Sequence, residues 1–238
     1  MEKTVLFEKE NGIAIITLNR PHRRNAINQD LLINLYNYID AVAGSDDITV
    51  AILTGNGNSF CSGLDLDVIG KDNLIDPRGD GVDLPDIMHR CKKPIIGAVN
   101  GHAITGGFEL ALNCDFLIAS EKASFADTHA KVGIHPGWGM TQLLQQAVGQ
   151  RMAKQMSLTC QFIPAPEALR IGLVNEVVPP EKLVARTREI AGFMTQTNKA
   201  IMMKVKELIE FRNRAYLDTA YANERKGFKN FYFKKLNG

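Results

Sequence analysis

Three short, almost continuously apolar runs constrain the fold of this chain most strongly. They span residues 50–54, 94–99 and 115–119. Runs of this length and composition are typical of strands that are buried on both faces of a parallel sheet. Helical patterns at residues 31–42 and 106–112 alternate with them. The sequence therefore predicts an α/β fold with a βαβ core and right-handed crossovers.

The remaining patterns predict a hairpin before this core and helices after it. Residues 5–8 and 13–18 are rich in β-forming residues, and Asn11-Gly12 between them favours a tight turn. Asn28 and Asp30 are candidate caps for the helix that follows. Beyond the core, further helices are expected at residues 136–146, 166–171, 180–195 and 199–216.

Charge and composition argue against several classes of function. The 238 residues include 28 basic and 26 acidic side chains, a formal net charge of +2, so no concentrated basic face for nucleic acid is expected. The charged N-terminus does not resemble a secretory signal, and polar residues interrupt every apolar run before the ~20 residues that span a bilayer. No membrane association is therefore expected.

The cysteines indicate a reducing compartment. They are widely scattered, at Cys61, Cys91, Cys114 and Cys160, with no close pair of the kind that metal sites use. We therefore expect no metal site, reduced thiols and a cytoplasmic location.

Two glycine-containing loops follow buried strands and are the strongest candidates for a ligand site. They occupy residues 54–66 and 99–110. Open α/β sheets bind ligands at the carboxyl ends of their strands, and a helix that begins at Gly106 adds unpaired N–H donors. Neither loop has the spacing of a phosphate-binding motif. The alternatives are two structural turns or two backbone donors that converge on one oxyanion.

An ordered series of motifs spans nearly the whole chain. In order it comprises Asn19-Arg-Pro-His-Arg-Arg-Asn-Ala26, Phe60-Cys-Ser-Gly-Leu-Asp65, Lys93-Pro-Ile-Ile-Gly-Ala-Val-Asn-Gly101, Gly106-Gly-Phe-Glu109, Cys114-Asp115, Phe125-Ala-Asp127, Pro136-Gly-Trp-Gly139 and residues 169–178. In this series the chain resembles the crotonase family, also called the enoyl-CoA hydratase/isomerase superfamily. The resemblance implies a crotonase-like ββα spiral core over residues 1–180. It also implies a helical C-terminal region over residues 181–238 that serves in trimerisation and covers the active site.

The resemblance also implies where an acyl-CoA thioester binds. Its carbonyl oxygen is expected between the backbone N–H groups of Ser62 and Gly106, and coenzyme A, as part of the substrate, needs no other bound cofactor. The residues implied for binding coenzyme A are His22, Arg23, Arg24 and Ala26, together with Ser62, Gly63, Leu64 and Asp65. Leu66, Val68, Ile69 and Trp138 are candidates either for the acyl pocket or for the core. Lys229, Lys234 and Lys235 are candidates for a phosphate contact, the alternative being a basic helical end.

Glu109 matches the position of a catalytic glutamate of the family. It lies one helical turn after Gly106, so both residues can face the same cleft. A carboxylate in an apolar cleft can act as a general acid or base. Without the resemblance, a first-turn glutamate that complements the helix dipole would be the simpler reading.

The chain departs from the family pattern at His129. Hydratases of the family carry a second glutamate, in a Pro-Glu pair, seven residues before the proline that corresponds to Pro136. Here that position is His129, preceded by Thr128. An imidazole can serve as acid or base near neutral pH, and Asp127 could orient it if the backbone is extended. The alternative is a histidine that only hydrogen-bonds in the pocket wall.

The function predicted from sequence is therefore that of an enoyl-CoA hydratase-like enzyme in acyl-CoA metabolism. Glu109 and His129 would be its acid–base pair, and a homotrimer or dimer of trimers its assembly. Two alternatives stay open. One is an acyl-CoA-binding homologue without efficient hydratase activity, and the other is an isomerase or racemase that uses Glu109 alone.

Overall fold

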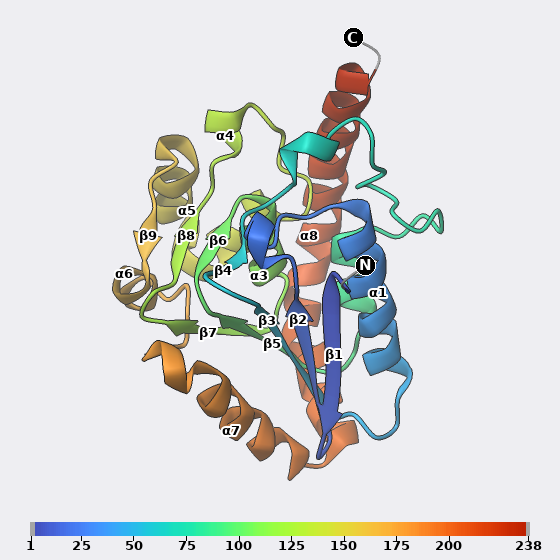
Figure 1. Ribbon diagram of the computed structural model, residues 1–238, viewed down its shortest axis with the longest axis vertical. Helices are drawn as coiled ribbons and strands as arrows, with labels where there is room; N and C mark the ends of the chain where they lie inside the picture. Colours follow the sequence, from blue (N-terminus) through green and yellow to red (C-terminus); the bar gives the residue numbers. More distant parts are fainter. Residues whose placement is uncertain (1–2, 237–238) are drawn as a thin grey trace.

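Two sheets form the centre of the fold (Figure 1). The computed structural model describes residues 3–236, without the side chains of residues 211–217, 220, 223 and 231–236. The larger sheet has the order β1-β2-β3-β5-β7-β10, and only its β1–β2 hairpin is antiparallel. Its strands are β1 (Val5–Glu10), β2 (Ile13–Leu18), β3 (Val50–Gly55), β5 (Ile95–Val99), β7 (Phe116–Ser120) and β10 (Glu176–Val178).

Three strands of the smaller sheet directly follow strands of the larger one, and the fourth, β9, follows α5. Its order is β4-β6-β8-β9, for strands β4 (Ser59–Cys61), β6 (His102–Ile104), β8 (Ser124–Ala126) and β9 (Ile163–Pro164). After β3, β5 and β7 the chain adds one short strand to this second sheet before its next helix. This repeat is the ββα spiral that the family resemblance implies. The simpler βαβ pattern read from the apolar runs omits the second sheet.

Helices cover both faces of the larger sheet. They are α1 (Gln29–Gly44), α2 (Leu84–Arg90), α3 (Gly106–Leu112), α4 (His129–Val132), α5 (Met140–Thr159), α6 (Ala165–Arg170), α7 (Leu183–Thr195) and α8 (Lys199–Leu236), with 3-10 turns η1 (Pro21–Arg23), η2 (Leu66–Val68) and η3 (Pro180–Lys182). Helix α7 packs across β2, β3, β5 and β7, whereas α8 runs the full height of the molecule (Figure 1). None of the helices in the described part of the chain is both long and apolar enough to cross a membrane.

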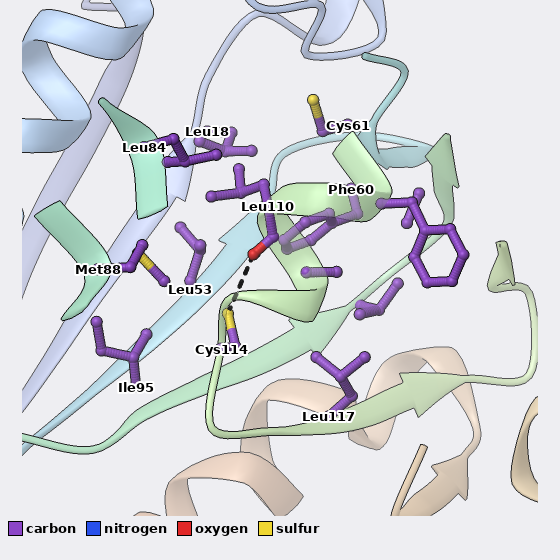
Figure 2. Close-up of a cluster of buried hydrophobic side chains, with 14 of the residues drawn as sticks. Leu18, Leu53, Phe60, Cys61, Leu84, Met88, Ile95, Leu110, Cys114 and Leu117 are labelled. Atoms are coloured by element: carbon purple, nitrogen blue, oxygen red, sulfur yellow. Dashed lines mark hydrogen bonds between the residues drawn. The ribbon is translucent and has the colours of Figure 1, made fainter. Parts of the chain in front are cut away.

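Apolar contacts between the sheet and α1, α2 and α3 make up the main core. Figure 2 shows Leu53 and Ile95 of the large sheet packed with Met88 of α2 and Leu110 of α3. Helix α3 also approaches β4 at backbone distance, because a Cβ atom at Gly107 would lie 2.1 Å from the carbonyl oxygen of Cys61. This close approach brings the start of α3 against the loop that follows β4.

Several helix limits differ from those expected from sequence. The N-cap expected at Asn28 is confirmed, because its side chain accepts the N–H of Leu31 at 3.0 Å at the start of α1. Helix α5 begins at Met140 and not at residue 136, which leaves residues 136–139 as a turn. Helix α8 continues to Leu236, past the helical pattern at residues 199–216 but within the helical C-terminal region expected over residues 181–238. Both differences matter for the site.

Candidate active site

The two glycine-containing loops meet at the start of α3. Gly63 has a φ of +92°, a conformation that suits glycine. A Cβ atom at Gly63 would lie 2.9 Å from the carbonyl oxygen of Ile104 and 3.3 Å from the backbone nitrogen of Gly106. Thr105, the residue before Gly106, has a strained φ of 52°. The structure thus brings together the two loops that sequence reasoning selected.

The backbone donors of the first loop differ from the expected ones. The N–H of Ser62 donates to the carbonyl oxygen of Arg24 at 3.1 Å, so it is already engaged. Ile27 forms an isolated β-bridge with Leu64, in which its N–H donates to the carbonyl of Gly63 and its carbonyl accepts the N–H of Asp65. The N–H of Leu64 takes no part in this bridge and is unbonded within the described residues. Leu64 therefore has an available N–H next to Gly106, whereas that of Ser62 is engaged, and the expectation for Ser62 is corrected on this ground.

Gly106 supplies the second donor position. As the first residue of α3, its N–H has no acceptor inside the helix. A Cβ atom at Gly106 would lie 3.6 Å from Cδ2 of Leu64 and 3.4 Å from Cζ3 of Trp138. The two N–H groups therefore lie on adjoining segments beside an apolar wall.

Glu109 is held in one orientation by the backbone of residues 137–140. Its side chain is buried, and its Oε1 accepts the backbone N–H groups of Gly137, Trp138 and Met140 at 3.2, 2.9 and 3.2 Å. Its other oxygen, Oε2, lies 3.6 Å from Nε2 of His129. One carboxylate oxygen is thus fixed by the protein, and the other faces the histidine.

His129 connects Glu109 to a second buried carboxylate. Its Nδ1 lies 2.6 Å from Oδ1 of Asp127, which also accepts the backbone N–H of His129 at 3.2 Å. Burial by itself lowers the pKa of His129, but the hydrogen bonds and charges of Asp127 and Glu109 outweigh it and raise this pKa to about 10. Burial alone would raise the pKa of Asp127, and its bonds to His129 lower it instead. The group is therefore an imidazolium between two carboxylates.

The backbone between Asp127 and His129 is not extended, in contrast to the expectation from sequence. Thr128 has φ −104° and ψ 15°, and His129 is the first residue of α4. The two side chains meet because Asp127 lies where the chain turns into that helix. Asp127 nevertheless orients His129, as proposed from the spacing.

The segment expected to bind coenzyme A lies beside the first loop. His22, Arg23 and Arg24 are exposed, and Arg23 pairs with Asp67 at 3.0 Å. Ala26 and Asp65 are buried, in contrast to these side chains. The segment therefore presents basic side chains at the surface next to the first loop, which carries the N–H of Leu64.

Sequence reasoning missed Arg20, which joins this segment to the loop. Its guanidinium pairs with Asp65 at 3.0 Å and also donates to the carbonyl oxygen of Ala26. Both charged side chains are largely buried, so this ion pair fixes the Asn-Arg-Pro segment against the first loop. The only signal in the sequence was the position of Arg20 within the Asn-Arg-Pro motif.

The acyl-pocket candidates divide into two groups. Trp138 is buried, and its ring packs against Phe228 of α8 with centroids 6.5 Å apart. Ile69 packs with Ile134 and Phe228. Leu66 is exposed, and Val68 is half-buried against the core. Lys229 is exposed, and the side chains of Lys234 and Lys235 lie outside the described residues.

A separate cavity of about 720 Å³ lies near the other end of α3. It is lined by Asn113 directly after α3 and by residues of α3, α5, α7 and α8 that include Leu143, Phe193 and Val205, and by no residue expected to act on the thioester. Among the described residues, no group of three or more His, Cys, Asp or Glu side chains is arranged to hold a metal ion.

Comparison with known proteins gives a consistent result. The sequence profile of the family described as enoyl-CoA hydratase/isomerase matches residues 8–236. A short-chain-enoyl-CoA hydratase of Clostridium acetobutylicum is 40% identical over 228 residues, which cover 94% of this chain and 87% of that protein. A probable peroxisomal enoyl-CoA hydratase 1 of Arabidopsis thaliana is 40% identical over 212 residues, which cover 87% of this chain and 79% of that protein. The crystal structure of an enoyl-CoA hydratase from Mycobacterium avium superposes with a TM-score of 0.87 at 37% identity, covering 99% of this chain and 100% of that one.

Proposed function

The chain belongs to the enoyl-CoA hydratase/isomerase family, and from this premise we propose that it adds water to the double bond of an enoyl-CoA thioester. The observation that carries the proposal is the pairing of Glu109 Oε2 with His129 Nε2 at 3.6 Å, beside the free N–H of Gly106. Relatives from two kingdoms carry names that describe hydratases. The enzyme is accordingly a lyase of this family that acts on acyl-CoA.

The first part of the mechanism is stabilisation of an enolate. The N–H groups of Leu64 and Gly106 would donate to the thioester oxygen as negative charge develops on it. Donors of this kind typically lower a barrier by ~3–4 kcal/mol each. Leu64 replaces Ser62 in this role, because the N–H of Ser62 already binds the carbonyl of Arg24.

The second part is transfer of two protons by Glu109 and His129. The Glu109 side chain, as general base, takes a proton from water while the water oxygen bonds to the β-carbon. The His129 imidazolium gives its Nε2 proton to the α-carbon, and the proton on Glu109 then passes to His129. The net change is the addition of one water molecule. The cycle as proposed uses these side chains, water and the thioester, with coenzyme A as part of the substrate.

A direct assay tests this function. Hydration of crotonyl-CoA by the native chain should remove the absorbance of the conjugated double bond. Tight binding of butyryl-CoA without turnover would instead identify an acyl-CoA-binding homologue. Exchange of solvent deuterium into the substrate without net hydration would indicate an isomerase or racemase that relies on Glu109.

We expect Arg24→Ala to raise KM for crotonyl-CoA about fivefold and to leave kcat nearly unchanged. Arg24 is exposed next to the first loop, where a guanidinium can bind a phosphate of coenzyme A. Steady-state kinetics at low and high salt measures the effect, which salt should weaken. Arg170→Ala is the matched control, because Arg170 is also exposed but pairs with Glu167 within α6. Equal changes in the two variants would contradict a role for Arg24.

We further propose that the chain assembles as a homotrimer or a dimer of trimers. Large apolar side chains are exposed along α7 and α8, among them Phe193, Ile201, Leu208 and Ile209. Exposed apolar patches of this kind mark interaction surfaces. Sedimentation equilibrium should give three or six times the 26.3 kDa chain mass. Ile209→Lys should shift the assembly toward monomer, and a native monomer would contradict the proposal.

A reducing, cytoplasmic location is the last part of the proposal. The four cysteines are free, and burial is the main cause that raises the pKa of Cys61 to about 12, which keeps that thiol unreactive. The Arabidopsis relative is named as peroxisomal, so fractionation of the native cells is the deciding measurement.

A further inference from the structure

Two carboxylates share the start of helix α5. The backbone N–H groups of Gly137, Trp138 and Met140 donate to Glu109, as described above. The two remaining N–H groups of this five-residue turn, those of Gly139 and Thr141, donate to Glu224 at 2.6 and 3.2 Å. The hydroxyl of Thr141 also donates to Glu224. Every N–H from residue 137 to residue 141 thus binds one of two glutamates.

The turn depends on these glutamates because its own sequence supplies no acceptor. Helix α5 begins after Gly139, which has a φ of +100°, and within the described residues its first turn contains no acidic side chain and no capping side chain of its own. A helix start normally needs acceptors for its first N–H groups and favours negative charge. Here one acceptor comes from α3 and the other from α8.

Glu224 is firmly placed on this turn. Its side chain is buried, and Tyr221, one turn earlier on α8, packs so closely that a Cβ atom at Gly139 would lie 2.7 Å from its ring. Arg225, the next residue, binds Asp83 at 2.7 Å and Asp86 at 2.8 Å at the start of α2. The C-terminal half of α8 is therefore anchored on both sides of Glu224.

We propose that Glu224 is a positioning residue for Glu109. By accepting the N–H groups of Gly139 and Thr141, it leaves Glu109 bound to the other three and keeps Glu109 Oε2 directed at His129. Without Glu224, the buried N–H of Gly139 and the part-buried N–H of Thr141 lose their acceptor, and the other carboxylate on the turn is Glu109 itself. The turn and Glu109 would then rearrange, and Oε2 would leave His129. This inference rests on the proposed function, in which Glu109 and His129 act as a pair.

The electrostatics of the turn agree with this role. Burial is the main cause that raises the pKa of Glu224, and the charge of Glu109 adds to it. The charge of Glu109 thus disfavours a charged Glu224, and the N–H groups of the turn offset this repulsion. Removing the N–H contacts of one should displace the other.

Kinetics of three variants tests the proposal. Glu224→Ala should lower kcat for crotonyl-CoA hydration by about 10- to 100-fold, the usual effect of misplacing a catalytic group, with KM changed less than about threefold. Glu224→Gln keeps one amide oxygen as acceptor and should lose only about fivefold in kcat, and it carries the test if Glu224→Ala does not fold. Asp218→Asn is the matched control, because Asp218 is an exposed carboxylate on the same helix. An unchanged kcat in both Glu224 variants, or an equal loss in Asp218→Asn, would overturn the proposal.

A second measurement does not depend on turnover. The imidazole of His129 faces Asp127 and Glu109, and its titration can be followed by NMR and assigned by the loss of signal in His129→Asn. If Glu109 Oε2 moves away in Glu224→Ala, the midpoint of this titration should fall by about one pH unit. An unchanged midpoint would sink the positioning role even if the native chain hydrates no substrate. A native chain without turnover, but with the expected NMR shift, would instead refute only the proposed function.

Discussion

Replacement of Glu109 by glutamine is expected to lower kcat for crotonyl-CoA hydration about a thousandfold, the range that a general acid or base contributes. The amide cannot take a proton from water. Its oxygen can still accept the N–H groups of the turn at residues 137–140, so its nitrogen would face Nε2 of His129 in place of a carboxylate oxygen. The fold should therefore persist while both proton transfers fail. Stopped-flow or steady-state assays at saturating substrate measure the loss.

Two controls show whether the loss concerns chemistry. Affinity of Glu109→Gln for butyryl-CoA, measured by calorimetry, should stay within about twofold of native, because Glu109 is assigned no part in holding the coenzyme. Glu121→Gln changes an exposed carboxylate elsewhere and should leave kcat unaltered. Retention of more than a tenth of native kcat by Glu109→Gln would rule out its role as the base.

The larger sheet could be predicted because its strands carry a clear signal. Strands β3 and β5 are buried on both faces and read as unbroken apolar runs. The smaller sheet could not be predicted by the same argument. Its strands β4, β6 and β8 have three residues each, too few to show a period of any kind. The family resemblance, and not the apolar pattern, implied the ββα spiral.

The candidate site was predictable where its residues are close in sequence. Gly106 and Glu109 lie one turn apart on α3, and Asp127 lies two residues before His129. Contacts between distant segments could not be foreseen. Glu224 reaches the turn before α5 from 85 residues away. Whether Ser62 or Leu64 has the free N–H depends on the carbonyl of Arg24, in another part of the chain.

Replacement of His129 by asparagine is expected to lower kcat at least about a hundredfold and to destabilise the fold by about 3 kcal/mol at neutral pH. The variant leaves Asp127 and Glu109 as buried carboxylates without a cation between them. Because folding raises the pKa of His129 from 6.5 to about 10, its stabilising effect is complete below pH 6.5 and is lost as pH rises through 10. Urea unfolding at several pH values should show this alkaline loss in the native chain and not in the variant.

Replacement of His129 by glutamate sharpens this prediction, because the family resemblance places a glutamate at that position in hydratases. In this chain the new carboxylate would lie between Asp127 and Glu109, which now contact Nδ1 and Nε2 at 2.6 and 3.6 Å. Three like charges in a buried site are unfavourable, so His129→Glu alone should have a lower kcat than the native chain. The double variant Asp127→Asn/His129→Glu removes one charge and should exceed the single variant about tenfold in kcat. If His129→Glu is as active as the native chain, the site does not require the positive charge of His129. Asp127 would then tolerate a carboxylate at position 129.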